Sequence, residues 1–338
     1  MHPYSTPVGV TSACRMPASS VESAAPFSRL VGRIQVEALL NCRVAVTRGL
    51  HGHVGRALPF DRVVYLLMVL RESAAFRGTC TGVAAAGERP SGISINAIAA
   101  SLGQPFETAR RHVNALIDDG VARRGPGGVE VRPEALARGP LAAMLVDLHD
   151  TMIRLVEDLR TFGVPVPPPR GGVPYCREAT IAAALDLMLA AHEYLVQGYR
   201  SGLEMVVVNA VVAASVRHIT FDRILALRYA AADTPPPDQL RRSVAPRPIA
   251  RGLLIPYTTV RRQIERSVAR GMLVMRDGGV RGAPAFLDQS SLMAGGAVSA
   301  AVVSRVARAF ERLGPGGFPF DDPASRYIGS RPALIAFA

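Results

Sequence analysis

Lysine and tryptophan do not occur in this chain of 338 residues, and cysteine is scarce. The four cysteines stand at scattered positions: Cys14, Cys42, Cys80 and Cys176. None belongs to a Cys-x-x-Cys pair, which argues against a zinc knuckle and a disulfide framework. His51 and His53 lie near Cys42 in sequence but lack a third ligand at a useful spacing, so we expect no metal site and no cofactor. No Ser/His/Asp or Cys/His arrangement stands out, and we therefore expect a protein that is not an enzyme.

Because lysine is absent, every basic residue is an arginine. The 39 arginines exceed the 27 carboxylates, which gives a formal charge of +12 and a pI of about 10.5. A GC-rich genome explains the choice of arginine over lysine, since alanine, glycine and proline are abundant too, but it does not explain the excess of positive charge. That excess favours a polyanionic partner through phosphate contacts and counterion release.

Long apolar runs are also absent. The first 27 residues lack the positive start and apolar block of a signal peptide. The most apolar run, Met205–Val216, is too short to span a bilayer and contains Asn209, so it predicts a buried helix. We expect a cytoplasmic, nucleoid-associated protein that does not contact a membrane.

Two stretches of the chain resemble each other at a constant spacing of 151 residues. The first repeat, IAASLGQPFETARRHVNALIDDGVARRGPGGVEVRPEAL, begins at Ile98, and the second, IARGLLIPYTTVRRQIERSVARGMLVMRDGGVRGAPAFL, begins at Ile249. They align without a gap and share 13 identical residues. Each pattern predicts a helix, a tight turn, a second helix and a glycine-tipped hairpin. The tripeptide Phe-Asp-Arg occurs upstream of both repeats, at Phe60 and at Phe221. It suggests that the duplication extends upstream, with a loop of different length between the tripeptide and the repeat in each half.

Composition divides the rest of the chain. The first 27 residues are rich in Ser, Pro, Ala and Gly and are predicted to be disordered. Residues 164–175 contain VPVPPPRGGVP, a semi-rigid spacer that marks a boundary between halves 28–163 and 176–314. Residues 315–338 are predicted to form an irregular tail. Apolar periodicity predicts flanking helices at 28–48, 60–75, 139–162, 177–197, 202–218 and 291–313.

In the first repeat, Ser94 is expected to cap a helix over 95–101, and Leu102-Gly103 to form the turn. The second helix, Pro105–Asp118, has one buried apolar stripe and one polar face, and strands 121–124 and 129–132 surround a turn at Gly127-Gly128. Arginine, asparagine and threonine are residue types that contact base edges and phosphates. The candidate DNA contacts are Thr108, Arg110, Arg111, Asn114, Arg123 and Arg124.

The second repeat places the corresponding helix at Pro256–Ala269. Its candidate DNA contacts are Thr258, Thr259, Arg261, Arg262, Gln263, Arg266, Arg276 and Arg281. This repeat has seven arginines against two carboxylates, whereas the first has five of each. We therefore expect the second repeat to supply more of the affinity for phosphates.

The segments ETARRHVNALIDDGVARR and TTVRRQIERSVARGMLVMR resemble the winged helix-turn-helix of bacterial transcriptional regulators of the MarR, GntR and IclR kind. The resemblance implies a mainly α fold with small β-wings, in which two winged helix-turn-helix modules are flanked by long helices. It also implies that recognition helices 105–118 and 256–269 bind double-stranded DNA sequence-specifically. Since such regulators commonly dimerise, a homodimer and an intramolecular pseudo-dimer both stay open. A small-molecule effector is conceivable, but no residue pattern supports one.

Two other functions stay open. The near-neutral first repeat also fits a scaffold or adaptor whose winged helices bind proteins. Plasmid-type replication initiators use paired winged helices as well. The alternative to DNA contact for Arg110 and Arg111 is pairing with Glu107 and Asp118 on a solvated helix face.

Overall fold

The computed structural model describes residues 25–73, 76, 91–193, 198–287 and 297–337. Within them the chain is mainly helical and has two small antiparallel sheets, as predicted. The predicted disordered segment 1–27 lies outside the described residues, except for Ala25–Phe27, which form the 3-10 helix η1. The loop over 78–90 and the start of the helix predicted from 291 also lie outside them.

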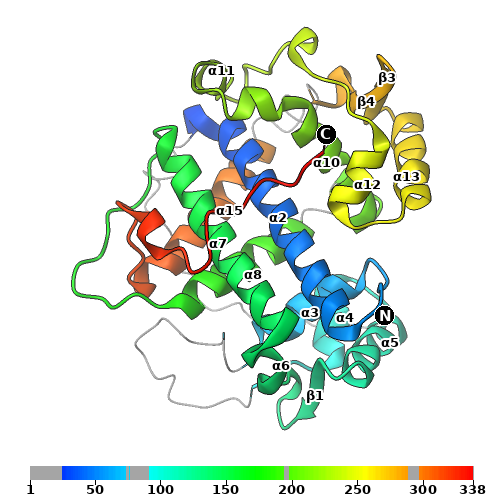
Figure 1. The fold of residues 1–338 in the computed structure, drawn as a ribbon, viewed down its shortest axis with the longest axis vertical. Coiled ribbons are helices and arrows are strands. Elements are labelled where there is room, and N and C mark those ends of the chain that lie inside the picture. Colours follow the sequence, from blue (N-terminus) through cyan, green and yellow to red (C-terminus); the bar gives the residue numbers. More distant parts are fainter. Residues whose placement is uncertain (1–24, 74–75, 77–90, 194–197, 288–296, 338) are drawn as a thin grey trace, which may run out of the picture.

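Helix α2 (Ser28–Val54) crosses the middle of the molecule (Figure 1). It runs six residues beyond the predicted end at Arg48 and stops at Gly55, whose left-handed backbone (φ 75°) lets its N–H donate to the carbonyl of His51. Helices α7 (Gly139–Thr161), α8 (Arg177–Glu193) and α15 (Ala297–Leu313) pack around α2 and against one another. These four helices form the scaffold of the molecule.

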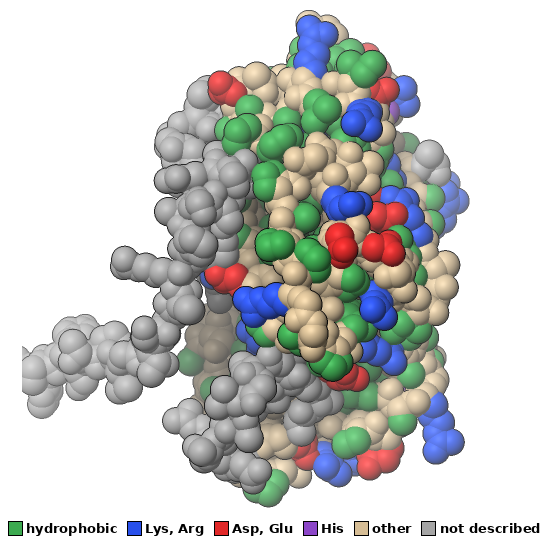
Figure 2. Space-filling model, turned by 90° about the vertical axis from the view of Figure 1, so that its left-hand side faces the viewer, with side chains coloured by type: hydrophobic (Ala, Val, Ile, Leu, Met, Phe, Trp, Pro, Cys, Tyr) green, Lys and Arg blue, Asp and Glu red, His purple; other side chains and the backbone are tan. Residues whose placement is uncertain are grey.

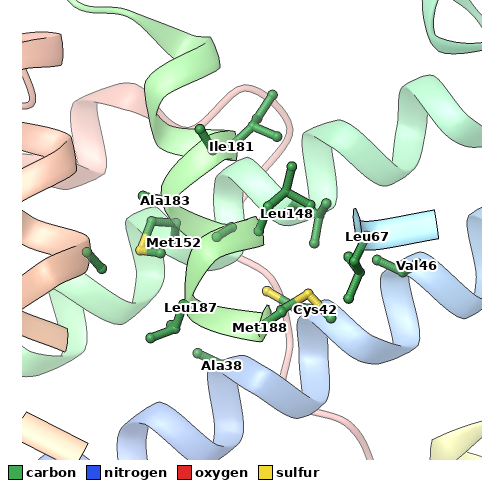
Figure 3. Close-up of a cluster of buried hydrophobic side chains, with 14 of the residues drawn as sticks. Ala38, Cys42, Val46, Leu67, Leu148, Met152, Ile181, Ala183, Leu187 and Met188 are labelled. Atoms are coloured by element: carbon green, nitrogen blue, oxygen red, sulfur yellow. The ribbon is translucent and has the colours of Figure 1, made fainter. Parts of the chain in front are cut away.

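The scaffold has a closely packed apolar core (Figure 3). Ala38, Cys42 and Val46 follow one another at intervals of four residues, so they share one face of α2. They face Leu148 and Met152 of α7, both at most 1% exposed. Burial also raises the pKa of the Cys42 thiol to about 12, so this cysteine is inert at neutral pH.

Two smaller units stand on this scaffold, and each contains a pair of short helices followed by a hairpin. The first unit comprises α4 (Ile95–Leu102), α5 (Phe106–Asp118), β1 (Ala122–Gly125) and β2 (Gly128–Val131). The second unit comprises α12 (Pro246–Leu253), α13 (Tyr257–Ala269), β3 (Leu273–Arg276) and β4 (Gly279–Gly282). The bounds of each element differ from those of its counterpart by 151 residues, the spacing of the sequence repeats.

The turns of the two units differ in detail. The Ser94 hydroxyl accepts a hydrogen bond from the N–H of Ala97 at 3.1 Å, which confirms the predicted cap. The predicted hairpin turn at Gly127-Gly128 is wrong by one residue, because Gly125 pairs with Gly128 around Pro126-Gly127. The second hairpin instead turns at Asp277-Gly278 with φ of 48° and 71°, a type I′ turn that the fixed φ of Pro126 excludes in the first.

Each hairpin gains a third extended segment that precedes the first helix of its unit. Ile93 and Val129 exchange two backbone hydrogen bonds of 3.0 and 2.8 Å, and Val244 and Val280 exchange two of 2.9 Å. This pairing covers the outer edge of β2 and of β4. It also fixes where α4 and α12 begin relative to the hairpins.

Replacing Gly128 with alanine is expected to destabilise the protein by more than about 2 kcal/mol, because strain and overpacking add. Gly128 has a φ of 122°, and a Cβ built on it would lie 2.5 Å from the backbone carbonyl carbon and oxygen of Ile93. Gly120→Ala is the matched control, since Gly120 has a φ of 73° but open space around its Cβ position. Urea unfolding of both variants checks this; equal losses would show that the close approach to Ile93 does not matter.

Different helices support the two units. Helix α3 (Arg62–Arg71) packs against α5 and β2, whereas α10 (Gly202–Thr220) packs against α13 and β4. In the second half, the Phe-Asp-Arg tripeptide at Phe221 leads into α11 (Arg223–Arg228) and not into the supporting helix α10. Helix α11 contacts α10, and its Ile224 is 79% exposed. The structural correspondence therefore does not follow this upstream motif.

The ends of α7 and α15 differ, although both precede a glycine. Gly163 takes a left-handed backbone (φ 76°) after α7, which is the usual way for a helix to stop. Helix α15 ends at Leu313, the predicted end, but Gly314 does not take a left-handed backbone. The chain continues there as the 3-10 helix η3 (Gly314–Gly316), and Gly317 takes the left-handed position. The remaining short helices are α6 (Pro133–Ala137), η2 (Asp238–Leu240) and η4 (Pro323–Arg326).

Past η4 the C-terminal segment is extended and packs onto the scaffold (Figure 1). The buried Asp150 carboxylate accepts the N–H groups of Ile328 and Gly329 at 3.0 and 2.8 Å. Farther along, Phe337 is only 6% exposed and packs in a second apolar core formed mainly by α10 and the second unit. The tail therefore connects the scaffold to that unit.

The predicted boundary at 164–175 separates the halves in sequence more clearly than in space. Helices α8 and α15 follow this segment, yet they contribute to the same core as α2, α3 and α7. The second core receives Leu40 from α2. Helix α10 is the one helix among the described residues with the length and composition of a membrane span, but most of its apolar residues belong to this second core or pack against it.

Lowering the pH from 7.5 to 6.0 is expected to reduce the free energy of unfolding. Burial lowers the pKa of five histidines from their ordinary value of 6.5: His51, His112, His149, His192 and His218. The unfolded chain therefore binds more protons than the folded one just below pH 6.5, and stability is lost as the pH falls through that value. Burial raises the pKa of Asp147 and of Asp158 above the ordinary value of 3.8. These two carboxyl groups therefore favour the folded state as the pH falls, and they oppose the effect of the histidines. Urea unfolding at both pH values measures the change; equal or higher stability at pH 6.0 would contradict it.

Candidate nucleic-acid interface

Helix α5 turns one face to the first unit's interior and the other to solvent. Ala109, Val113 and Leu116 are fully buried, as the apolar stripe predicts. On the outer face Arg110 and Arg111 are exposed, and Thr108 and Asn114 are half-buried. Four candidate residues of the first repeat thus lie on or beside the exposed face of one helix.

Ion pairs within the first unit occupy part of this face. The Arg110 guanidinium donates to both carboxylate oxygens of Glu107 at 2.8 and 2.6 Å, the pairing that the sequence left open. Both side chains are exposed, so the pair adds little stability and phosphate can displace it. Arg111 makes no ion pair with any described residue, and Asp118 does not pair with either arginine.

The first hairpin is tied to its own unit. Arg124 donates to the side-chain oxygen of Asn114 at 2.9 Å, which links the hairpin to α5. Arg123 donates to Glu130 at 2.9 Å, and Glu130 also accepts the hydroxyl of Ser91 at 2.6 Å. Two candidate DNA contacts, Asn114 and Arg124, therefore satisfy each other.

His112 faces α3 and not the arginines' solvent side. Its ring stacks on Tyr65 with centroids 4.4 Å apart and an interplanar angle of 11°. Burial, then the charge of Arg62, lowers its pKa, and nearby Asp61 acts in the opposite direction. His112 is neutral at pH 7 and serves to pack α5 on α3.

The second unit exposes more unpaired positive charge. Val260 and Ile264 are buried, while Thr258, Arg261, Arg262 and Arg266 are exposed on α13, and Thr259 is half-buried. Arg261 donates to Glu265 at 2.8 Å in a pair whose side chains are 64% and 58% exposed, so it is weak.

On α13 and the hairpin, three arginines make no hydrogen bond or ion pair within the described part of the chain: Arg262, Arg266 and Arg276. The first two lie on α13, and Arg276 lies at the tip of the hairpin, where it is exposed. We call these three residues the arginine face. Their charges are available to an anion from outside.

Two candidate contacts of the second repeat lie in the interior. Gln263 is 5% exposed and donates to the hydroxyl of Ser267 at 3.3 Å. Arg281 is 7% exposed and donates to the carboxylate of Asp238 and to the carbonyl of Arg241. Both side chains are buried and hydrogen-bonded within the protein, so neither belongs to the arginine face.

Arg281 occupies the position that Glu130 holds in the first unit. Glu130 and Arg281 are both buried on the second strand of their hairpin, but they carry opposite charges. Their ion-pair partners also carry opposite charges: Arg123 pairs with Glu130, and Asp238 pairs with Arg281. The sequence alignment shows this exchange, yet only the structure shows that it concerns an internal support.

Sequence reasoning missed one arginine near the arginine face. Arg247 is exposed in the first turn of α12, and its guanidinium lies 5.3 Å from the centre of the Tyr257 ring at the start of α13. The available signal was an arginine just ahead of Ile249, where the second repeat begins, but it lies upstream of the repeated stretch.

Both units lie toward the same side of the molecule, at opposite ends of its long axis (Figure 1). Figure 2 views the opposite side, where arginines and carboxylates are interspersed among apolar and polar side chains and no continuous basic patch is visible. Exposed arginines without carboxylate partners on α13 thus contrast with the mixed charge of that opposite face.

Nothing in the described residues resembles a metal centre: they contain no group of three or more His, Cys, Asp or Glu side chains that could hold an ion. His51, one of the histidines near Cys42, accepts the N–H of Leu58 at 3.0 Å through Nε2. No protein-family model, no curated protein and no solved structure matches this chain.

Proposed function

We propose that this chain is a cytoplasmic, nucleoid-associated transcriptional regulator that binds double-stranded DNA through two winged helix-turn-helix modules. Helices α5 and α13 would enter major grooves as recognition helices. The hairpins β1–β2 and β3–β4 would act as wings along the flanking backbone. The presence of both modules in one chain favours an intramolecular pseudo-dimer, in which α2 spans the two modules.

The order and pairing of the elements support this proposal. In both units an extended segment, two helices and a hairpin follow one another downstream of the supporting helix, and the extended segment pairs with the hairpin. This is the order of a winged helix. Because such a module also serves in protein-binding domains, the order alone does not decide between DNA and a protein partner.

The observation that carries the proposal is the arginine face of the second unit. Arg262, Arg266 and Arg276 stand on the outer side of a recognition-type helix and its hairpin with no carboxylate to neutralise them. A phosphate backbone supplies the compensating charge, and each phosphate contact releases a counterion. We expect the logarithm of the binding constant to fall linearly with the logarithm of the salt concentration.

Fluorescence anisotropy with a labelled random-sequence duplex, titrated at several salt concentrations, tests this proposal. With three phosphate contacts, a plot of log K against log salt should have a slope of about −2.7 or steeper. Binding that is absent at low salt, or that does not change with salt, would reject a DNA-binding function.

An adaptor function is the second candidate, and the first unit favours it. Arg110, Arg123 and Arg124 are all engaged by side chains of that unit, and Phe106 is 48% exposed beside them. A stoichiometric protein partner recovered without salt-sensitive DNA binding would support it. A replication initiator remains the third candidate. Binding at a repeat-rich origin would favour it, whereas binding at a promoter would favour a regulator.

A further inference from the structure

A cavity of 90 Å³ lies where α2, α3, α8 and α10 meet. Its walls are mostly apolar and come from all four helices: Leu39, Leu40, Val64, Leu67, Met188 and Met205. Leu67 and Met188 belong to the scaffold core, whereas Leu40 belongs to the second core. The cavity therefore occupies the junction of the two cores.

One charged side chain in this wall lacks a charged partner. Arg43 donates to the carbonyl of Phe60 at 2.6 Å and stacks on the Phe60 ring, 3.8 Å from its centre. No described carboxylate forms an ion pair with it. Asp61 is exposed and also lines the cavity; its charge raises the pKa of Arg43, but burial has the larger effect and lowers that pKa to about 9. A partly buried cation beside an apolar cavity is costly unless an anion pairs with it.

We propose that this cavity binds a small apolar carboxylic acid, whose carboxylate pairs with Arg43 and whose hydrocarbon part packs against Leu39, Val64 and Met205. A guanidinium binds a carboxylate through two parallel hydrogen bonds, and apolar walls bind a hydrocarbon group favourably. An apolar cavity of about 150 Å³ holds a benzene molecule. By the same measure, a cavity of 90 Å³ holds a hydrocarbon group of about four carbons, so it selects a short branched chain.

The position of the cavity links the ligand to both units. Val64 and Leu67 belong to α3, which supports α5, and Met205 and Val206 belong to α10, which supports α13. A bound acid would contact both supporting helices at once. An effect of the acid on DNA affinity rests on the proposed function, whereas its binding to the cavity does not.

Isothermal titration of the full chain with 2-methylpropanoate and 3-methylbutanoate, in the absence of DNA, tests the proposal. The corresponding primary amides are matched controls because they keep the shape and lose the charge. We expect saturable binding of at least one acid and at least tenfold weaker binding of its amide. Arg43→Met should weaken binding of the acid at least tenfold, since it removes the cation and keeps an unbranched apolar side chain.

Ala191→Leu keeps Arg43 and fills the cavity, because Ala191 is 6% exposed and lines it. This variant should abolish binding even if Arg43→Met does not fold. Absence of binding by both acids at millimolar concentration, equal binding of acid and amide, or unchanged binding to Ala191→Leu would each overturn the proposal. A chain that binds the acid but no duplex would reject the proposed DNA-binding function and leave the cavity site standing.

Discussion

Replacing Arg262 and Arg266 together with alanine is expected to weaken duplex DNA binding by at least tenfold. A base-contacting arginine contributes about 1–3 kcal/mol, and each lost phosphate contact lowers the salt slope by about 1. Neither arginine makes an ion pair or hydrogen bond with the described residues, so their removal leaves no internal partner unsatisfied. Anisotropy titrations of the double variant at several salt concentrations measure both effects.

Two control variants sharpen this prediction. Arg160→Ala with Arg308→Ala removes the same charge from exposed positions on α7 and α15, and should change affinity little. Arg110→Ala with Arg111→Ala should cost less than the loss at the second unit, because Arg110 is already paired with Glu107. Equal losses for all three double variants would mean that net charge, and not the arginine face, sets DNA affinity.

Replacing Glu37 with alanine is expected to cost about 3–5 kcal/mol of stability, because it leaves a partly buried guanidinium unpaired. Glu37 of α2 is 4% exposed and accepts two hydrogen bonds from Arg217 of α10, at 2.8 and 2.7 Å. The same guanidinium donates to the carbonyl of Ile335 at 2.6 Å and lies 4.9 Å from the centre of the Phe337 ring. One ion pair thus joins the scaffold, the second unit's support and the tail.

Urea unfolding measures this loss, with Glu265→Ala as the control. Glu265 pairs with Arg261 on the surface, where an ion pair contributes about 0–1 kcal/mol. Glu37→Met combined with Arg217→Met should recover most of the loss, since an apolar pair leaves no charge unpaired. A loss below 1 kcal/mol for Glu37→Ala would show that the pair does not hold α10 on α2.

The sequence repeat predicted the elements of the two units closely because local signals define them. Ser94, Pro105 and Gly120 mark helix ends through capping and backbone preference, and the apolar stripe of α5 fixes its buried face. The turn at Pro126-Gly127 was misplaced by one residue because GPGG offers several glycine positions and only the pairing of β1 with β2 chooses among them.

The candidate site was harder to predict, because charge partners come from distant parts of the chain. Nothing local shows that Arg281 meets Asp238, 43 positions earlier, or that α10 and not α11 supports the second unit. Gln263 was placed on the polar face by residue type, yet Ser267 four positions later gives it an internal partner. Periodicity identifies a helix face, but tertiary contacts decide which polar side chains remain free.

Binding of the purified chain to pooled genomic DNA fragments over a salt series, followed by sequencing of the bound fraction, tests the central proposal most directly. The proposal predicts a steep loss of binding with salt and enrichment of one motif whose two half-sites reflect two modules in one chain. Weak binding that is insensitive to salt and enriches no motif would contradict it.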